Sequence, residues 1–483
     1  MARKVKQVIE HGIDKREVGY YSTPDFVAKY LTDEMLRINS HGKFVLDPAV
    51  GKEELLAYFY SAGKEIDSYD IIDYQRHNYS HFTKKDFIEV YKEFKADYFF
   101  GSKPNTKYDY IIANPPYNCH EVSYIRDNKA QLKKLFEVGV YNMYSMYLSA
   151  IIDMAKEGCL IGVIISDSFL TATYHSKLRE KIFSTCSIHQ LILCPTKLFW
   201  SQKADVRTCI LILQKGIKFQ STIKLSDRCS SVEEFRDKLN KKDLKEVDLR
   251  SIKLGCGSQI LVDVDSSIIN LFQDYPSLGS LYRCVTCIST GNDSKYLVAK
   301  PQKGYTIPFY KNPASRKFTA IEDAYLIDDF LNIHQWDKNF MVRNKDLLGK
   351  EGIACSSMGL PFSAVYLPCN AVTGVNPTIF PPVEDIDWLL AFLNSSLVTY
   401  LVRGVLIRSN MVTSGYVSCL PIISFSKNEK KSLANISFEA RNGMLTSKEA
   451  VEAVDKVIYS KGILPEYVYT HIKYFCQNLG KSV

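Results

Sequence analysis

The sequence of 483 residues has no long hydrophobic run. No stretch approaches the roughly 20 consecutive apolar residues that span a bilayer. The first residues, MARKVKQVIEHGIDKRE, contain no apolar signal core, so no secretion signal is expected. We therefore expect a cytoplasmic protein without a membrane partner.

The cysteines follow neither a disulfide framework nor a metal-binding pattern. There are 13 of them, scattered and odd in number, which suits a reducing compartment. Cys284 and Cys287 form one C-x-x-C, but no second ligand pair follows at zinc spacing. We therefore expect no metal site.

The overall composition is that of a soluble globular protein, with 46% hydrophobic and 24% charged residues. The length predicts two domains or slightly more. Lysine and arginine number 61 against 53 acidic residues, a formal charge of +8. This mild excess permits a polyanionic partner without requiring one.

The most informative stretch is Asn114-Pro115-Pro116-Tyr117, which follows the run YDYIIA. The run predicts a strand buried in a parallel sheet, and the two prolines end its hydrogen-bond ladder because neither has an N–H. Open α/β sheets bind ligands beyond the carboxyl ends of their strands. There the Asn114 side-chain oxygen and the Pro115 carbonyl could accept N–H bonds from a flat ring bearing an amine, with Tyr117 stacked on it. A simple strand-ending turn also fits the tetrapeptide taken alone.

Strand-like and helix-like runs alternate around this stretch. The strand-like runs include 44–46, 108–113, 160–165, 191–193 and 209–213, and the helix-like runs include 53–60, 143–156 and 176–183. Thr23 could cap an earlier helix, with Pro24 at its first position. The alternation predicts a doubly wound parallel sheet over about 20 to 215.

Three acidic positions stand near the ends of strand-like runs. Asp47 opens the small-residue turn DPAVG, which would let backbone approach a ligand. Asp70 lies about 23 residues further on, near the spacing at which an acid meets ribose hydroxyls in nucleotide-binding folds. Asp86, followed by Phe87, is the third candidate. For each acid taken alone, a solvated loop carboxylate is the alternative.

The pattern changes in the second half of the chain. Lys215 to about Lys253 is rich in charge and predicts a linker or an exposed helix. Beyond it, short strand-like runs and glycine turns carry basic residues interleaved with aromatics, which suits a nucleic-acid surface but also an ordinary solvated one. We therefore expect an arm over 1–19, a catalytic domain over 20–250, and a second domain over 251–483 with a helical end.

The order of these motifs resembles that of the gamma-class N6-adenine DNA methyltransferases of restriction–modification systems. STPDFVAKYL, VLDPAVG, YDYIIANPPY and KLFWSQKADVRTCILIL carry the resemblance in that order. It implies an α/β, Rossmann-like sheet that uses S-adenosyl-L-methionine, followed by a mixed α+β target-recognition domain that binds double-stranded DNA.

The resemblance also assigns roles to residues. Asn114, Pro115, Pro116 and Tyr117 would form the catalytic motif, and Phe199 would stack with Tyr117 on a flipped adenine. The residues expected to bind the cofactor are Tyr21, Thr23, Asp47, Pro48, Ala49, Gly51, Asp70, Asp86, Phe87 and Asn114. The residues expected to contact DNA are Lys295, Arg316, Arg343 and Arg408.

Two features depart from the family pattern. The cofactor loop usually has a second glycine two residues after Gly51, whereas this chain has Glu53, and a side chain there could crowd the cofactor. Asp86 lies farther from the catalytic motif than is common, so Asp97 is a rival for the contact with the cofactor's adenine ring.

Three other functions remain open from the sequence: methylation of RNA, methylation of protein glutamine, and a recognition subunit that has lost catalysis. The N-terminal cofactor helix and the large C-terminal domain favour the DNA enzyme. Because no nuclease constellation stands outside these motifs, we expect any restriction endonuclease activity on a separate chain or in a defence complex.

Overall fold

The computed structural model describes residues 21–75, 77–99, 106–118, 123–199, 207–216, 222–254, 256–407 and 411–479. The chain divides into two compact units. The first comprises Met1–Lys253 with Gly257–Asp263, and the second comprises Leu254–Cys256 with Val264–Val483. The division thus falls close to the expected domain boundary at 250, and the expected arm over 1–19 lies outside the described residues.

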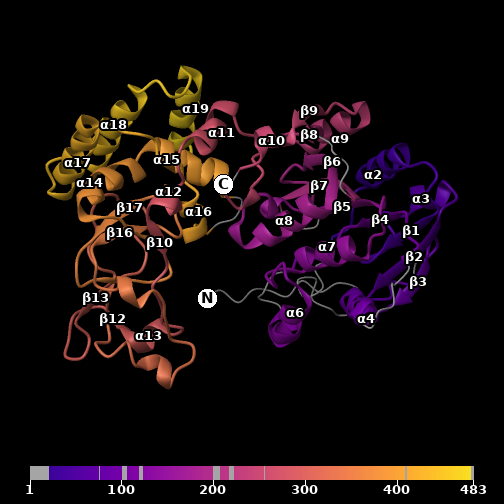
Figure 1. The fold of residues 1–483 in the computed structure, drawn as a ribbon, viewed down its shortest axis with the longest axis horizontal. Helices are drawn as coiled ribbons and strands as arrows, with labels where there is room; N and C mark the ends of the chain where they lie inside the picture. Colours follow the sequence, from indigo (N-terminus) through magenta and orange to yellow (C-terminus); the bar gives the residue numbers. More distant parts are fainter. Residues whose placement is uncertain are drawn as a thin grey trace. The chain divides into compact units, whose positions relative to one another are not determined.

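The first unit is built on a nine-stranded sheet with the order β3-β2-β1-β4-β5-β7-β6-β8-β9 (Figure 1). Its strands are β1 (Phe44–Asp47), β2 (Glu65–Asp70), β3 (His81–Lys84), β4 (Tyr110–Ala113), β5 (Leu160–Ser166), β6 (Cys186–Leu193), β7 (Thr208–Lys215), β8 (Thr222–Ser226) and β9 (Lys245–Asp248). The five strands from β3 to β5 are parallel neighbours. β7 is antiparallel to both β5 and β6, and β9 is antiparallel to β8. The predicted Rossmann-like sheet is confirmed as a mostly parallel one.

Helices cover both faces of this sheet (Figure 1). On one face α2 (Asp25–Ile38) packs against α3 (Ala57–Ser61) and α9 (Val232–Lys241). On the other face α7 (Met143–Met154) packs against α4 (Phe87–Phe99) and α8 (Ser176–Thr185). Apolar side chains of α2, α3 and α9 form one buried cluster with β1, β4 and β5. This core fixes the carboxyl ends of the central strands in place.

Of the two alternatives predicted for Lys215 to Lys253, a linker or an exposed helix, the linker is wrong, and a helix, α9, does form within this stretch. β8 and β9 extend the sheet there, and α9 buries Phe235 and Leu239 completely against the first unit. These two apolar positions are four residues apart and so share one helix face, while the charged residues that suggested a linker occupy the rest of the helix.

The predicted helix over 53–60 also begins later than expected. Residues 51–56 form turns, and α3 starts only at Ala57. Glu53 has a φ of 63°, in the left-handed region, which a right-handed helix cannot include.

The second unit is a mixed α+β structure, as predicted. One four-stranded sheet contains β10 (Arg283–Val285), β19 (Thr378–Phe380), β16 (Gly352–Cys355) and β17 (Ala364–Leu367). A second contains β12 (Leu297–Val298), β14 (Ala324–Leu326), β13 (Ile307–Tyr310) and β18 (Val372–Thr373), and β11 (Ile288–Ser289) pairs with β15 (Met341–Val342).

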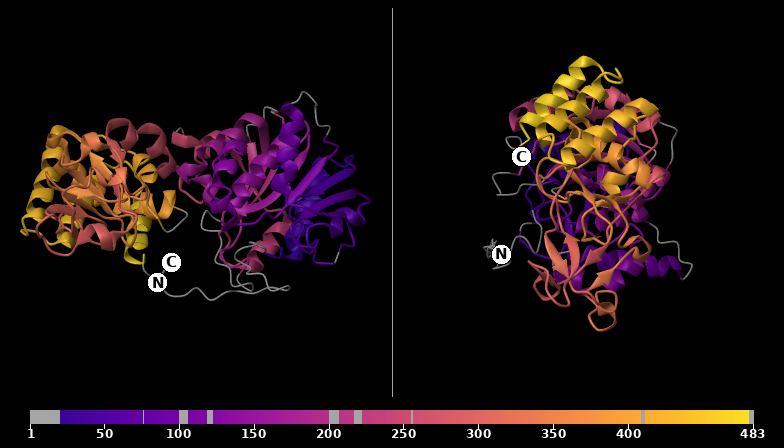
Figure 2. Two further views of the ribbon diagram at one scale, coloured as in Figure 1. Left: turned by 90° about the horizontal axis from the view of Figure 1, so that it is seen from below. Right: turned by 90° about the vertical axis from the view of Figure 1, so that its left-hand side faces the viewer.

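Helices make up the end of this unit. They include α14 (Val383–Leu393), α15 (Ser396–Tyr400), α17 (Lys427–Arg441), α18 (Ser447–Tyr459) and α19 (Glu466–Gln477). α17 packs against α14 and α18, and α19 packs against α15 (Figure 2). Among the described residues no single helix is long and apolar enough to cross a membrane; Val383–Leu393 and Ser396–Leu406 meet that length and composition only together, as a pair bent by 68°.

Candidate active site

Four polar side chains stand at the carboxyl ends of four neighbouring strands. Asp47 and Asp70 are the last residues of β1 and β2, Asp86 lies two residues beyond β3, and Asn114 directly follows β4. Because β3, β2, β1 and β4 are adjacent and parallel, these side chains lie along one edge of the sheet. The sequence had assigned all four to a single site.

Asn114 is held by the segment that precedes α2. Its Nδ2 donates to the Tyr21 carbonyl at 2.8 Å and to Thr23 Oγ1 at 3.0 Å. A carbonyl can only accept, so this contact fixes which end of the amide carries the oxygen. Thr23 does not cap α2, which begins at Asp25 with Pro24 as its N-cap residue, so the predicted capping role is wrong.

Three aromatic rings gather beside Asn114. The ring centroids of Tyr21 and Tyr117 are 5.6 Å apart, those of Tyr21 and Phe199 are 6.0 Å apart, and those of Tyr117 and Phe199 are 6.4 Å apart. Phe199 reaches the cluster from the connection that follows β6, about 80 residues along the chain from Tyr117. The two rings expected to flank one base therefore do lie together.

Tyr117 also contacts Asn114 directly. Its hydroxyl lies 2.6 Å from Asn114 Oδ1 and 2.9 Å from the Ile164 carbonyl, and both of these oxygens can accept its proton. Burial raises the pKa of Tyr117, so the hydroxyl keeps that proton at neutral pH. An amide oxygen has two lone pairs, so Asn114 Oδ1 keeps one acceptor site for an N–H donor beside the Tyr117 hydroxyl.

The turn after β1 presents acidic oxygens and a backbone N–H side by side. Asp47 Oδ1 accepts from the Ala49 N–H at 3.0 Å, and Asp70 Oδ2 accepts from the Gly51 N–H at 2.9 Å. Asp47 Oδ2 is buried and has no hydrogen-bond partner among the described residues, and burial raises the pKa of Asp47 well above its usual range. Burial likewise raises the pKa of Asp70. Gly51 adopts a φ of 54°. This turn is suited to a ligand that brings hydroxyl or ammonium donors.

Glu53, which stands where the family has glycine, points its side chain at another loop. Its Oε2 accepts from the backbone N–H groups of Asn78 at 2.5 Å and Tyr79 at 3.0 Å. Its Oε1 accepts from the N–H of Ser80 at 3.0 Å and from the Ser80 hydroxyl at 2.6 Å. Glu53 is 2% exposed and thus ties the turn after β1 to the loop that precedes β3. From the sequence we expected that this side chain could crowd the cofactor.

Asp86 directly precedes α4, and its carboxylate is fixed by two hydrogen bonds. Its Oδ1 accepts from the Ile88 N–H at 2.9 Å, and its Oδ2 accepts from the Tyr124 hydroxyl at 2.8 Å. Phe87 is buried, with its ring centroid 5.4 Å from that of Tyr147. The rival Asp97 is exposed and lies within α4, well beyond the end of β3. The contact from Tyr124 had no signal in the sequence.

The four residues expected to contact DNA belong to the second half of the chain, and Arg408 lies outside the described residues. Lys295 is exposed, with its Nζ 4.7 Å from the centre of the Trp336 ring and 3.7 Å from the Asp337 carboxylate. Arg343 is also exposed, and the contacts of its guanidinium with described residues are long, 3.5 Å to Thr286 and 3.6 Å to Met341.

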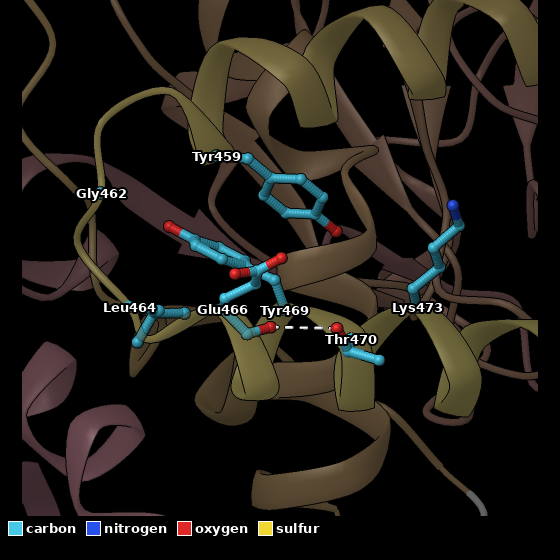
Figure 3. A pocket seen from close by; sticks show the side chains of 7 residues that line it. All are labelled: Tyr459, Gly462, Leu464, Glu466, Tyr469, Thr470 and Lys473. Atoms are coloured by element: carbon cyan, nitrogen blue, oxygen red, sulfur yellow. Dashed lines mark hydrogen bonds between the residues drawn. The ribbon is translucent and has the colours of Figure 1, made fainter.

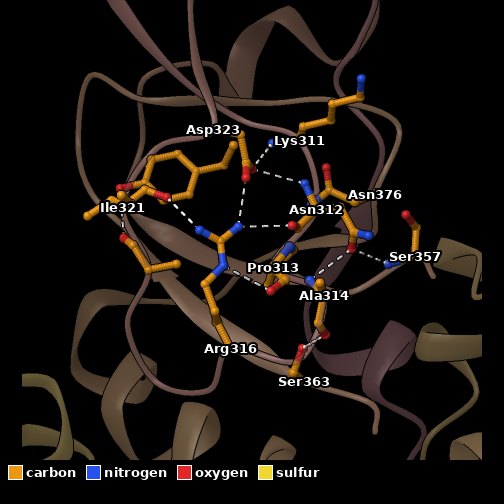
Figure 4. A network of polar contacts seen from close by, with 12 residues as sticks. Lys311, Asn312, Pro313, Ala314, Arg316, Ile321, Asp323, Ser357, Ser363 and Asn376 are labelled. Carbon is orange, nitrogen blue, oxygen red and sulfur yellow. Dashed lines mark hydrogen bonds and ion pairs between the residues drawn. The ribbon is translucent and has the colours of Figure 1, made fainter. Parts of the chain in front are cut away.

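Arg316 has a different environment (Figure 4). Its three nitrogens all donate within the second unit, and the acceptors are the carbonyls of Asn312, Pro313 and Ile321 and the carboxylate of Asp323. A DNA contact through this guanidinium would have to break bonds that hold its own loop together.

A cavity of about 450 Å³ also opens in the second unit, beside the connection between α18 and α19 (Figure 3). It is lined by Tyr459, Gly462, Leu464, Glu466, Tyr469, Thr470 and Lys473. None of the predicted site residues lies there.

Comparison with known proteins agrees with this geometry. Residues 12–258, slightly more than half of the chain, match the family model described as N-6 DNA Methylase. The type II methyltransferase M.BanIII of Aneurinibacillus aneurinilyticus is 30% identical over 216 residues, which cover 39% of this chain and 37% of that protein. The type II methyltransferase M.BsuBI of Bacillus subtilis is 24% identical over 239 residues, which cover 44% and 46%. The match thus spans less than half the length of each relative.

Solved structures show the same fold. The cryoEM structure of a DrdV–DNA complex aligns with a TM-score of 0.54 at 10% identity, over 88% of this chain and 57% of that one. A nuclease-deletion mutant of the Type ISP restriction-modification enzyme LlaGI, in complex with a DNA substrate mimic, aligns with a TM-score of 0.54 at 12% identity, over 88% and 55%. With the match to the family model, the strand-edge site and the sheet order lead to one conclusion: the chain belongs to the N-6 DNA methylase family.

Proposed function

We propose that this protein transfers the methyl group of S-adenosyl-L-methionine to the N6 amine of an adenine in double-stranded DNA. The observation that carries the proposal is the fixed amide of Asn114, which directs Oδ1 into a cluster of aromatic rings at the carboxyl edge of the sheet. A side-chain oxygen beside stacking surfaces suits a flat ring that bears an amine. Membership of the N-6 DNA methylase family supports adenine as that ring.

The edge of the sheet fits the cofactor. The Asp70 carboxylate would accept from ribose hydroxyls. Asp47 Oδ2, which has no hydrogen-bond partner within the described part of the chain, would offer a buried acceptor in the turn after β1. We assign Asp86 and Phe87 to the adenine ring of the cofactor, and Thr23 to its methionine end. When bound there, S-adenosyl-L-methionine supplies an electrophilic methyl group on a sulfonium sulfur.

The protein's own residues then orient the target amine. The base must leave the duplex stack to reach the pocket. Asn114 Oδ1 and the Pro115 carbonyl would accept its two N–H bonds, which favours a pyramidal nitrogen and directs its lone pair. The aromatic cluster would hold the ring by stacking worth roughly 1 to 3 kcal/mol. Positioning of this kind replaces a bimolecular encounter and supplies much of the rate.

Two observations bear on the alternative functions. The hypothesis of a recognition subunit without catalysis rested on Glu53, whose side chain was expected to crowd the cofactor. Its carboxylate is instead bonded to the 78–80 loop, which removes the reason for that hypothesis. RNA and glutamine substrates lack support in the family description, which specifies DNA. Both relatives are named type II methyltransferases, which favours a restriction–modification setting with any nuclease on another chain.

The test is transfer of labelled methyl from S-adenosyl-L-methionine to unmethylated genomic DNA, with RNA and protein extract in parallel. We expect the label to appear in the DNA as N6-methyladenine. Asn114→Ala should lower transfer by more than about a hundredfold, because it removes the acceptor that orients the amine, while cofactor binding and folding persist. Asn39→Ala is the matched control, since within the described ranges the Asn39 side chain accepts a single hydrogen bond, from the His41 N–H at 3.2 Å, in the exposed turn after α2.

Wild-type turnover by Asn114→Ala would refute the assignment of this residue. Label in RNA or protein but not in DNA would refute the substrate, and absence of cofactor binding by the wild-type protein would refute the enzyme.

A further inference from the structure

We propose that Tyr124 is a positioning residue for the cofactor: it orients the Asp86 carboxylate toward the exocyclic amine of the cofactor's adenine ring. The inference rests on the proposed function, since it presumes that S-adenosyl-L-methionine binds along this edge of the sheet.

The geometry at Asp86 is the first support. Each carboxylate oxygen already has one donor, the Ile88 N–H on Oδ1 at 2.9 Å and the Tyr124 hydroxyl on Oδ2 at 2.8 Å. A carboxylate offers about four lone-pair sites, so each oxygen keeps one acceptor site for a further donor. The two existing bonds fix the rotation of the carboxylate plane, which the Ile88 N–H alone would not fix.

The placement of Tyr124 is the second support. It lies in α5 (Ser123–Asp127), soon after the catalytic motif, and its ring lines a cavity of about 390 Å³ between α4 and α6 (Lys129–Leu135). The residue therefore has open space on one side, and the hydrogen bond that the described residues give its side chain is the one to Asp86. Burial and the Asp86 charge raise the pKa of Tyr124, so its hydroxyl acts as a donor throughout the working range of pH.

The chemical consequence is selectivity for an amine. A carboxylate held in one orientation accepts an N–H from adenine but repels the carbonyl oxygen that hypoxanthine carries at the same ring position. Tyr124 would thus increase the preference for a cofactor that carries adenine over one that carries hypoxanthine, without contacting the methyl group.

A matched control exists in the same unit. Tyr108 donates to Asp67 Oδ2 at 2.8 Å, the same length as the Tyr124 contact, and both tyrosines are partly buried. Tyr108 precedes β4, at the end of that strand opposite to Asn114. Tyr108→Phe therefore removes an equivalent bond away from the proposed cofactor site.

The experiment is calorimetric binding of two ligands to the full-length wild-type protein, Tyr124→Phe, Tyr108→Phe and Asp86→Asn. One ligand is S-adenosyl-L-homocysteine, and the other is its purine analogue, which lacks only the exocyclic amine. We expect Tyr124→Phe to weaken S-adenosyl-L-homocysteine binding roughly tenfold and the purine analogue less than about twofold. Tyr108→Phe should change both less than about twofold. The turnover number of Tyr124→Phe at saturating cofactor should match wild type.

The outcomes distinguish a wrong role for Tyr124 from a wrong proposed function. Wild-type or tighter binding of S-adenosyl-L-homocysteine by Tyr124→Phe, with binding weakened in Asp86→Asn, would overturn the role of Tyr124 and leave the proposed function standing. Equal losses for both ligands in Tyr124→Phe would show a merely structural role and would also overturn it. No binding of S-adenosyl-L-homocysteine to the wild-type protein would overturn the proposed function, and this inference with it.

Discussion

Replacing Glu53 by glycine, the residue that the family usually has there, should destabilise this protein. The change removes four hydrogen bonds to a carboxylate, from the N–H groups of Asn78, Tyr79 and Ser80 and from the Ser80 hydroxyl. At about 1.5 kcal/mol each these amount to about 6 kcal/mol. Glycine recovers about 1 to 2 kcal/mol because it adopts a φ of 63° without strain, and partial hydration of the released N–H groups recovers a similar amount. The expected net loss is about 2 to 4 kcal/mol.

The assay is hydrogen exchange of the loop over 78–80, followed by mass spectrometry, together with urea unfolding. A local loss of about 2 to 4 kcal/mol corresponds to exchange that is about 30- to 1000-fold faster. The control is Gln75→Gly, which also replaces a residue at positive φ, 54°, in the same unit, but whose side chain is exposed. That variant should be close to neutral, since the relief of strain offsets the greater freedom of its unfolded chain. Unchanged exchange in Glu53→Gly would refute the argument that this side chain ties the two loops together.

Two further predictions concern stability and DNA binding. Burial lowers the pKa of His175 to about 3 from the usual 6.5. Below about pH 6.5 the imidazole is therefore protonated in the unfolded chain but neutral in the folded one, and the free energy of unfolding falls as the pH falls. Between pH 7.5 and 5 this group should cost about 2 kcal/mol; His175→Gln should lose correspondingly less than wild type in urea unfolding at the two pH values, and equal losses would contradict the prediction. Arg316→Ala should lower the melting temperature, because it removes bonds within a loop. Arg343→Ala should leave the melting temperature unchanged, weaken DNA binding several-fold, and reduce by about one the slope of the logarithm of the binding constant against that of the salt concentration. DNA binding of both variants is measured by fluorescence anisotropy at several salt concentrations, and their stability by thermal unfolding. Weaker DNA binding by Arg316→Ala but not by Arg343→Ala would show that Arg316 is the DNA contact.

The positions of the site residues could be predicted wherever they follow a strand. Asp47, Asp70 and Asn114 end strands whose apolar patterns are local, and parallel strands bring such ends to one edge whatever the loops do. The direction of β7 could not be predicted in this way, because hydrophobic alternation reports burial and not which way a strand runs. β9 was missed because three of its four positions are charged, and β8, with one charge in five positions, lies within the same charge-rich stretch. The six charged positions of α9 left a linker and an exposed helix as equal alternatives.

The contacts of Glu53 and Tyr124 could not be predicted for a different reason. The carboxylate of Glu53 meets residues 25 to 27 positions away, and the hydroxyl of Tyr124 meets a residue 38 positions away. A hydrogen bond between distant side chains leaves no periodic trace in the sequence. Only the tertiary structure shows that Glu53 binds the 78–80 loop and that Tyr124 donates to Asp86.

Because Tyr21 and Thr23 hold the Asn114 amide, the proposed methyl transfer should depend on contacts that form late in folding. The amide is bonded to residues that lie 93 and 91 positions earlier in the chain, so it acquires its orientation only after the parallel sheet has closed between them. During refolding, methyl transfer should return after the far-ultraviolet circular dichroism signal. Local fraying of residues 21–24 would abolish the proposed methyl transfer while the sheet stays intact, so that loss of activity would precede loss of structure on heating.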